Sequence, residues 1–164
     1  MLLLLMRHGI AQPLGENSFD DFGRPLTPQG RARTRRAAVG LSTLVPHLDL
    51  VASSPKNRAR ATAQIVSDEF GQRAPAVTEW PELMGDDLTA LFAQIKKTKV
   101  KTALLCGHEP HLSALASQLL TGSPHDLALN FKKAGVMALE VDFSAPKAVL
   151  LWHLTPKQLR QIGR

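Results

Sequence analysis

The fold of this 164-residue chain is decided by residues 2–9, Leu2-Leu3-Leu4-Leu5-Met6-Arg7-His8-Gly9. Uncharged apolar residues that end at an Arg-His-Gly turn are typical of a short strand buried on both faces, as in a parallel sheet. Such a strand carries Arg7 and His8 to its carboxyl end, the edge at which open α/β sheets bind ligands. If later strands also end in anion-binding groups, the sequence predicts an anion site at this edge.

Apolar strands and amphipathic helices alternate along the chain after this first strand. Short apolar segments predict further strands at 48–53, 76–80 and 102–106. Capping residues followed by apolar residues at helical spacing predict helices that start at Thr27-Pro28, Ser54-Pro55, Asp86 or Asp87, and after Pro110. The third helix ends in a lysine run, where cations complement the helix dipole.

The C-terminal part of the chain follows a different pattern. Residues 136–143 alternate apolar and acidic side chains and residues 148–154 are again apolar, which together predict a hairpin at a sheet edge. A short helix over Pro156–Ile162 closes the chain. The whole order predicts an α/β fold, a three-layer α/β/α sandwich with a mostly parallel central sheet and an antiparallel edge hairpin, in one domain spanning residues 1–164.

Composition narrows the class of protein and of partner. The formal net charge of +6 favours anionic substrates or partners, although four arginines between Arg31 and Arg36 supply much of it and could be a solvated helix face. The single cysteine, Cys106, excludes an internal disulfide and a multi-cysteine zinc site. The chain has neither a secretory-signal pattern nor the roughly 18 uncharged apolar residues of a membrane span, so we expect a cytoplasmic protein without a membrane partner.

Three strand-to-helix junctions carry groups that bind or transfer phosphate. They hold Arg7 with His8, Arg58 in the first turn of the second helix, and His108 after the strand at 102–106. Arginine offers planar, permanently charged donors that match phosphate oxygens, and helix N-termini add backbone N–H groups. One imidazole can then be a neutral nucleophile while the other, charged, donates to a phosphoryl oxygen. This chemistry requires no metal ion or cofactor.

The motifs at these junctions resemble one known family. They are Arg7-His8-Gly9, Ser54-Pro55-x-x-Arg58-Ala59-x-x-Thr62, Gly107-His108-Glu109-Pro110, and Arg24-Pro25-Leu26-Thr27 followed by Gly30. In this order they resemble the histidine phosphatase superfamily, and within it the SixA-like phosphohistidine phosphatase branch. The resemblance implies that His8 becomes phosphorylated, that Arg7 and Arg58 bind the phosphoryl oxygens, and that His108 completes the pocket.

The proton donor is the point at which the chain departs from larger members of that superfamily. Only about twenty residues separate Trp80 from Val100, so the inserted region that carries their acid is missing. Glu82 is the nearest candidate acid, with Asp86, Asp87 and Glu109 behind it. An imidazole leaving group needs less help from an acid than an alkoxide does. We therefore expect a phosphohistidine substrate on a protein partner, such as a phosphotransfer domain or carrier.

Several alternatives stay open at this stage. The first is a broader phosphomonoesterase of the same superfamily that acts on small phosphorylated compounds, and the second is a binding module without turnover. Nucleic acid is a poor partner because aromatic residues are only 5% of the chain and no nucleic-acid-binding motif is present. Arg24, in the long loop at 10–26, is a further candidate for substrate binding. Arg60 competes with Arg58, but only one of the two can face the pocket, and the family motif favours Arg58.

Overall fold

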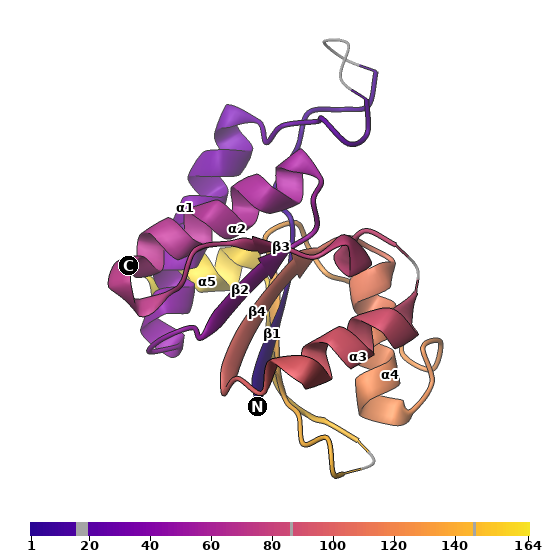
Figure 1. Ribbon diagram of the computed structural model, residues 1–164. Coiled ribbons are helices and arrows are strands. Elements are labelled where there is room, and N and C mark those ends of the chain that lie inside the picture. Colours follow the sequence, from indigo (N-terminus) through magenta and orange to yellow (C-terminus); the bar gives the residue numbers. More distant parts are fainter. Residues whose placement is uncertain (16–19, 86, 146) are drawn as a thin grey trace.

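The computed structural model describes residues 1–15, 20–85, 87–145 and 147–164 (Figure 1). Its strands are β1 (Leu2–Arg7), β2 (Leu50–Ser53), β3 (Thr78–Glu79), β4 (Thr102–Gly107), β5 (Val136–Glu140) and β6 (Val149–Leu154). Its α-helices are α1 (Pro28–Leu44), α2 (Asn57–Phe70), α3 (Leu88–Thr98), α4 (His111–Thr121) and α5 (Pro156–Ile162). Two short 3₁₀ turns, η2 (Gly71–Arg73) and η3 (Pro81–Leu83), flank β3. Within these described ranges no helix is both long and apolar enough to cross a bilayer.

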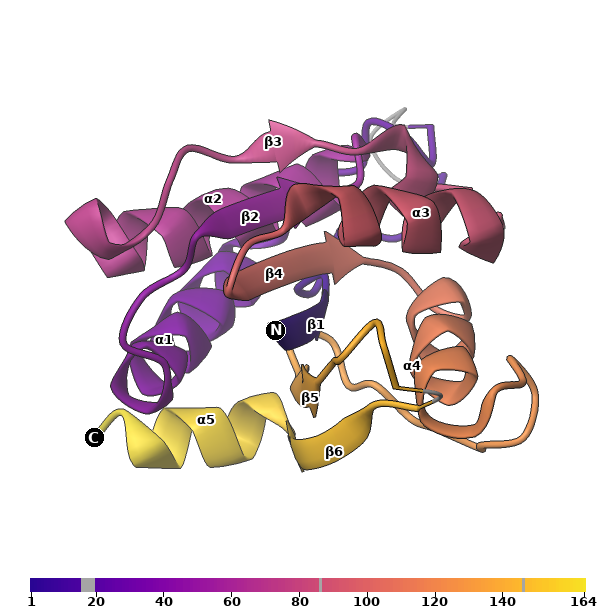
Figure 2. The same ribbon diagram turned by 60° about the horizontal axis from the view of Figure 1, so that its bottom comes forward.

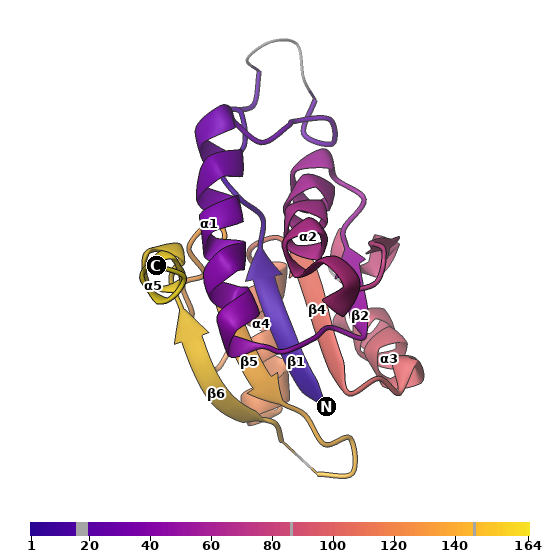
Figure 3. The same cartoon turned by 90° about the vertical axis from the view of Figure 1, so that its left-hand side faces the viewer.

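The six strands form one mixed sheet in the order β3-β2-β4-β1-β5-β6. The pairs β1–β4, β2–β4 and β2–β3 are parallel, whereas β5 is antiparallel to both β1 and β6. Figure 3 shows β6 as the outer strand beside α5. The predicted α/β sandwich with a parallel centre and an antiparallel edge hairpin is therefore confirmed.

Helices cover both faces of the sheet and make two cores (Figures 1 and 2). On one face α1, α2 and α5 pack on strand residues that include Leu4, Met6 and Leu104. On the other face α3 and α4 pack on Leu3, Leu5 and their neighbours. Alternate leucines of β1 therefore enter opposite cores, which explains why this strand is apolar at every position.

Local signals placed the helix starts well, with one exception. Thr27 caps α1 by accepting a hydrogen bond from the Gly30 N–H at 2.9 Å, and Asp87 caps α3 through the Ala90 N–H at 3.0 Å. Asp86, the other candidate cap, lies outside the described residues. The prediction that Ser54 caps α2 is wrong, because the helix begins at Asn57 and Lys56 occupies the cap position. The hydroxyl of Ser54 has another partner, described below.

The topology brings four chain segments to one edge. β1, β2 and β4 run in parallel and end together, since Arg7 pairs with Gly107 and Ser53 pairs with Cys106. β6 ends at the same edge because Leu154 pairs with Val136, which in turn pairs with Met6. The carboxyl ends of four strands therefore surround the region in which the sequence predicts an anion site.

Candidate active site

His8 and His108 face each other across the ends of neighbouring strands. Their ring centroids lie 5.1 Å apart, and both side chains are buried. The His8 N–H continues the β1–β4 ladder by donating to the Gly107 carbonyl at 3.1 Å. The register of two parallel strands therefore sets the spacing between the two imidazoles.

The ring of His8 is held in one tautomer. Its Nδ1 lies 2.7 Å from the carbonyl oxygen of Gly9, which can only accept, so Nδ1 carries the proton. Nε2 then presents its lone pair and lies 3.3 Å from Nε of Arg58. Burial, with smaller contributions from His108 and the two arginines, lowers the pKa of His8 to about 3. The imidazole is thus neutral near pH 7 and can act as a nucleophile.

Arg58 reaches the pocket from the first turn of α2. Its side chain is buried, and its guanidinium also bonds the backbone oxygen and the carboxylate of Asp21. Arg60 points away and forms an exposed ion pair with Glu79 at 3.1 Å. Of the two arginines, the structure therefore brings only Arg58 to His8.

His108 is oriented by Ser54, which lies 54 residues earlier in the chain. The Ser54 Oγ lies 2.8 Å from Nε2 of His108 and accepts from the Lys56 N–H at 3.3 Å. Nδ1 of His108 is buried and has no hydrogen-bond partner among the described residues. If Ser54 donates to Nε2, then Nδ1 carries the proton and is the donor available to a phosphoryl oxygen.

The expected charge on the second histidine is absent from this structure. Burial, followed by the positive charges of Arg58 and Lys56, lowers the pKa of His108 to about 3. Both imidazoles are therefore neutral near pH 7, so the positive charge at this edge comes from arginine. A neutral His108 can still donate one hydrogen bond.

Arg7 extends from the end of β1 beside His8. One of its terminal nitrogens donates to the Phe131 carbonyl at 2.7 Å, and its Nε is buried without a partner among the described residues. Its charge opposes protonation of His8 and favours ionisation of Glu109. The charge of Arg7 therefore acts both on His8 and on the partly buried carboxyl group of Glu109.

The loop that follows β1 returns to the site through Asp21. The Asp21 carboxylate pairs with Lys56 at 2.6 Å and with Arg24 at 2.7 Å, in addition to Arg58. These contacts, led by the hydrogen bond from Lys56, hold the pKa of Asp21 well below its usual range. Arg24 also donates to the Gln12 carbonyl, so its guanidinium is engaged in holding the loop.

The carboxyl groups considered as proton donors differ in their surroundings. Glu82, in η3, is partly exposed, and its carboxylate makes no hydrogen bond or ion pair with the rest of the described chain. Asp87 is engaged as the cap of α3, and Asp86 lies outside the described residues. Glu109 accepts from the Ser113 hydroxyl at 2.5 Å, leaves Oε1 buried without a partner in the described structure, and has its pKa raised by burial. Burial of Glu109 therefore favours the neutral form of its carboxyl group.

The contacts that two residues make at the site were not predicted from sequence. Ser54 and Asp21 act through contacts between distant segments, and neither has a local signal that distinguishes it from a helix cap or a loop carboxylate. Thr62 was part of a quoted motif without a role. Its hydroxyl accepts from the Gly9 N–H at 2.9 Å and donates to the Arg58 carbonyl at 2.7 Å, which ties the turn after β1 to α2.

Gly9 is required by the close approach of α1. A Cβ atom at this position would lie 2.4 Å from Oγ1 of Thr34. The absence of a side chain therefore lets the turn that carries His8 pack directly against the helix.

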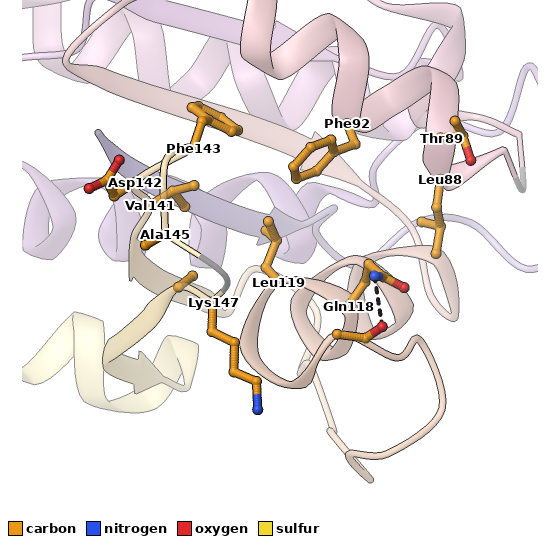
Figure 4. A pocket seen from close by; sticks show the side chains of 12 residues that line it. Leu88, Thr89, Phe92, Gln118, Leu119, Val141, Asp142, Phe143, Ala145 and Lys147 are labelled. Carbon is orange, nitrogen blue, oxygen red and sulfur yellow. Dashed lines mark hydrogen bonds between the residues drawn. The ribbon is translucent and has the colours of Figure 1, made fainter.

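A cavity of about 320 Å³ lies elsewhere, between α3, α4 and the segment after β5 (Figure 4). It is lined mainly by apolar side chains such as Phe92 and Phe143, whose rings meet edge to face at 5.6 Å. Glu140, just before this segment, pairs with Leu2 at the start of β1. This cavity is therefore at the amino edge of the sheet, away from the histidine pair.

Among the described residues no cluster of three His, Cys, Asp or Glu side chains could hold a metal ion.

Comparisons with known proteins give the family of the chain. The model of the histidine phosphatase superfamily (branch 1) matches residues 3–98. An uncharacterized protein of Picosynechococcus is 34% identical over 143 residues, which cover 85% of this chain and 84% of the relative. An uncharacterized protein of Mycobacterium tuberculosis is 30% identical over 151 residues, which cover 83% and 87%. The solved structure of the protein histidine phosphatase SixA complexed with tungstate has a TM-score of 0.84 and 26% identity, covering 97% of this chain and 99% of that one.

Proposed function

The chain belongs to the histidine phosphatase superfamily, and from this premise we propose that it is a phosphohistidine phosphatase that acts on a protein through a phosphorylated His8. The observation that carries the proposal is the state of His8. Its Nδ1–H is bound to the Gly9 carbonyl, its Nε2 lone pair points at Arg58, and its lowered pKa keeps it neutral. An imidazole in this state is prepared to attack phosphorus.

The proposed reaction has two displacements at phosphorus. In the first, the lone pair of His8 Nε2 forms a P–N bond, and the bond from phosphorus to the substrate imidazole breaks, its electron pair staying on the leaving nitrogen, which takes up a proton. In the second, water attacks phosphorus, the P–N bond to His8 breaks, and the proton lost by water balances the one taken up earlier. The products are phosphate and the unmodified histidine of the partner. The scheme uses no metal ion or cofactor.

The surrounding groups bind and stabilise the transferred phosphoryl group. Arg7 and Arg58 supply charged donors beside His8, and His108 supplies a donor from Nδ1. Phosphoryl transfer depends mainly on such positioning and charge stabilisation. Arg24 contributes through Asp21, which it holds against Arg58.

Phosphohistidine is the favoured substrate because of its leaving group and because of similarity. The solved relative with 26% identity is a protein histidine phosphatase. An imidazole leaving group needs little assistance from a general acid. This matters because Glu82 has no contact among the described residues that would position its carboxyl group to donate a proton. The partner would be a phosphotransfer domain or a carrier that bears phosphohistidine.

A second candidate function is hydrolysis of small phosphate monoesters. It is favoured by Glu109, whose raised pKa and unpartnered Oε1 suit a group that protonates an alkoxide. A substrate panel separates the two functions. Faster turnover of several alkyl phosphates than of phosphoimidazole would favour the second.

The test is a labelling experiment on wild type and His8→Ala. Each protein is incubated with radiolabelled phosphoimidazole, quenched in alkali and examined for label on the enzyme together with released phosphate. We expect alkali-stable, acid-labile label that maps to His8 and is absent from the variant. Phosphate release that does not depend on His8 would refute the mechanism, and label on another residue would reassign the nucleophile.

A further inference from the structure

A hollow of about 590 Å³ adjoins the active site on the side of β5 and β6. Arg7 lines it, together with residues from the start of α1, the loop before β5 and the start of α5. Figure 3 shows α1 and α5 side by side next to β6. These helices pack closely, since a Cβ on Gly40 would lie 1.8 Å from the Leu159 carbonyl oxygen. The same Arg7 that lies beside His8 therefore forms one wall of this hollow.

The lining of the hollow is strongly cationic. It contains no carboxylate, and its six cations are Arg7, Arg33, Lys132, Lys133, Lys157 and Arg160. None of the six forms an ion pair with a described carboxylate. Burial and the charges of Arg33, Arg36 and Arg164 lower the pKa of Arg160, so like charges repel across this surface. Such a cluster destabilises the folded protein unless an anion binds to it.

Two buried polar atoms at the hollow lack partners among the described residues. Thr34 is fully buried and lines the hollow, and its Oγ1 makes no hydrogen bond to any of them. The same is true of Nε of Arg7. Buried donors without partners are unusual in folded proteins and indicate that a ligand or a bridging group completes them.

We propose that an acidic stretch of the substrate protein binds in this cationic hollow while the phosphohistidine of the same protein lies in the active site. The inference rests on the proposed function and names the chemistry of its partner. A protein is favoured over a small anion because Arg33, Lys132, Lys133 and Lys157 are exposed and come from three separate segments. Exposed cations of this kind steer an acidic protein surface toward the hollow and fix its orientation there. They do not enclose a single phosphate ion.

Matched peptides test the proposal without knowledge of the natural partner. One peptide carries a single phosphohistidine flanked by glutamates, and its sister carries glutamines at the same positions. Phosphoimidazole is the substrate without a flank. The test variant is Lys132→Glu/Lys133→Glu, and the control is Lys96→Glu/Lys97→Glu, which makes the same charge change at the end of α3, at the amino edge of the sheet.

We expect wild type to prefer the glutamate peptide, and the preference to weaken at high salt. In Lys132→Glu/Lys133→Glu the kcat/KM for that peptide should fall about tenfold through KM, whereas phosphoimidazole turnover should change by less than about twofold. The control should retain the preference. Equal turnover of both peptides by wild type, or equal loss on all three substrates in the test variant, would overturn the docking inference.

A binding measurement separates this inference from the proposed function. The unphosphorylated glutamate peptide, labelled with a fluorophore, is titrated with wild type and with both variants. Binding that is lost only in Lys132→Glu/Lys133→Glu supports the docking surface even if no phosphohistidine is hydrolysed. Absence of binding to wild type, or binding that both variants retain equally, would overturn the docking inference.

Discussion

Nε of Arg58 lies 3.3 Å from Nε2 of His8, so the guanidinium proposed to bind phosphate also contacts the nitrogen proposed to attack it. In the proposed mechanism, one side chain from the first turn of α2 thus orients the nucleophile at the end of β1 and supplies charge to the phosphoryl group. This double role distinguishes Arg58 from Arg60, which lies on another face of the same helix and pairs with Glu79.

Replacement of the two arginines tests that distinction. Arg58→Ala should lower kcat/KM for phosphoimidazole by about a hundredfold or more, because it removes charge stabilisation in the transition state. Arg60→Ala should change the same ratio by less than about twofold, since it removes only an exposed ion pair. Steady-state kinetics on both variants decide the assignment, and a larger loss in Arg60→Ala would reverse it.

Ser54→Ala tests the orientation of His108. Loss of the 2.8 Å contact to Nε2 should free the ring to rotate and lower kcat about tenfold. Ser67→Ala is the control, because Ser67 is also buried and donates to the Pro75 carbonyl of the chain. Equal kcat for the two variants, measured alongside equal thermal stability, would show that Ser54 does not position His108.

The contrast between Arg58 and Ser54 shows what could be read from the sequence. Arg7, His8, Arg58 and His108 could be assigned to one edge of the sheet because each follows a strand or opens a helix, and local apolar patterns mark those boundaries. The contacts of Ser54 and Asp21 were not predicted, because they join segments 54 and 37 residues apart and no local pattern encodes them.

The cationic hollow was beyond prediction for a topological reason. Lys132 and Lys157 lie beside Arg7 only because β5 inserts between β1 and β6 and turns the end of β6 toward the same edge. The sequence predicted a hairpin at a sheet edge but not which edge. The sequence shows that the Arg31–Arg36 cluster is basic. That Arg33 lines the same hollow as Lys132 and Lys157 could be known only from the strand order.

Asp21→Asn tests whether this carboxylate competes with oxyanions for Arg58. Removing its charge should tighten inhibition by tungstate or phosphate about fivefold, a modest effect because Asp21 is partly exposed and screened. It should also lower thermal stability through loss of the Lys56 pair. Asp20→Asn is the control, because Asp20 accepts from the Gly23 N–H. Unchanged or weaker inhibition in Asp21→Asn would contradict the prediction.

Glutamine variants of Glu109 and Glu82 identify the proton donor. Glu109→Gln should slow hydrolysis of an alkyl phosphate by about a hundredfold and that of phosphoimidazole by less than about threefold, because only the alkoxide requires an acid. Glu82→Gln should leave both rates close to wild type. The opposite pattern, with Glu82→Gln selectively slow on the alkyl phosphate, would return the role to Glu82.

The neutral histidine pair should make the protein less stable in mild acid. The pKa of His8 and of His108 is about 3 in the folded protein and 6.5 in the unfolded chain, so between these values the unfolded chain binds more protons. The free energy of unfolding should therefore fall as the pH drops below about 6.5, by up to about 1.4 kcal/mol per pH unit for each histidine. Glu109 acts in the opposite sense because its pKa is raised, so the comparison must be between variants that all retain it.

Urea unfolding between about pH 7 and pH 5 measures how the free energy of unfolding changes with pH. This slope should be smaller in His8→Asn/His108→Asn than in wild type, with the exposed His125→Asn as control. A slope that the double variant does not reduce would mean that the two rings titrate alike in the folded protein and the unfolded chain, and burial would then not keep His8 neutral in mild acid.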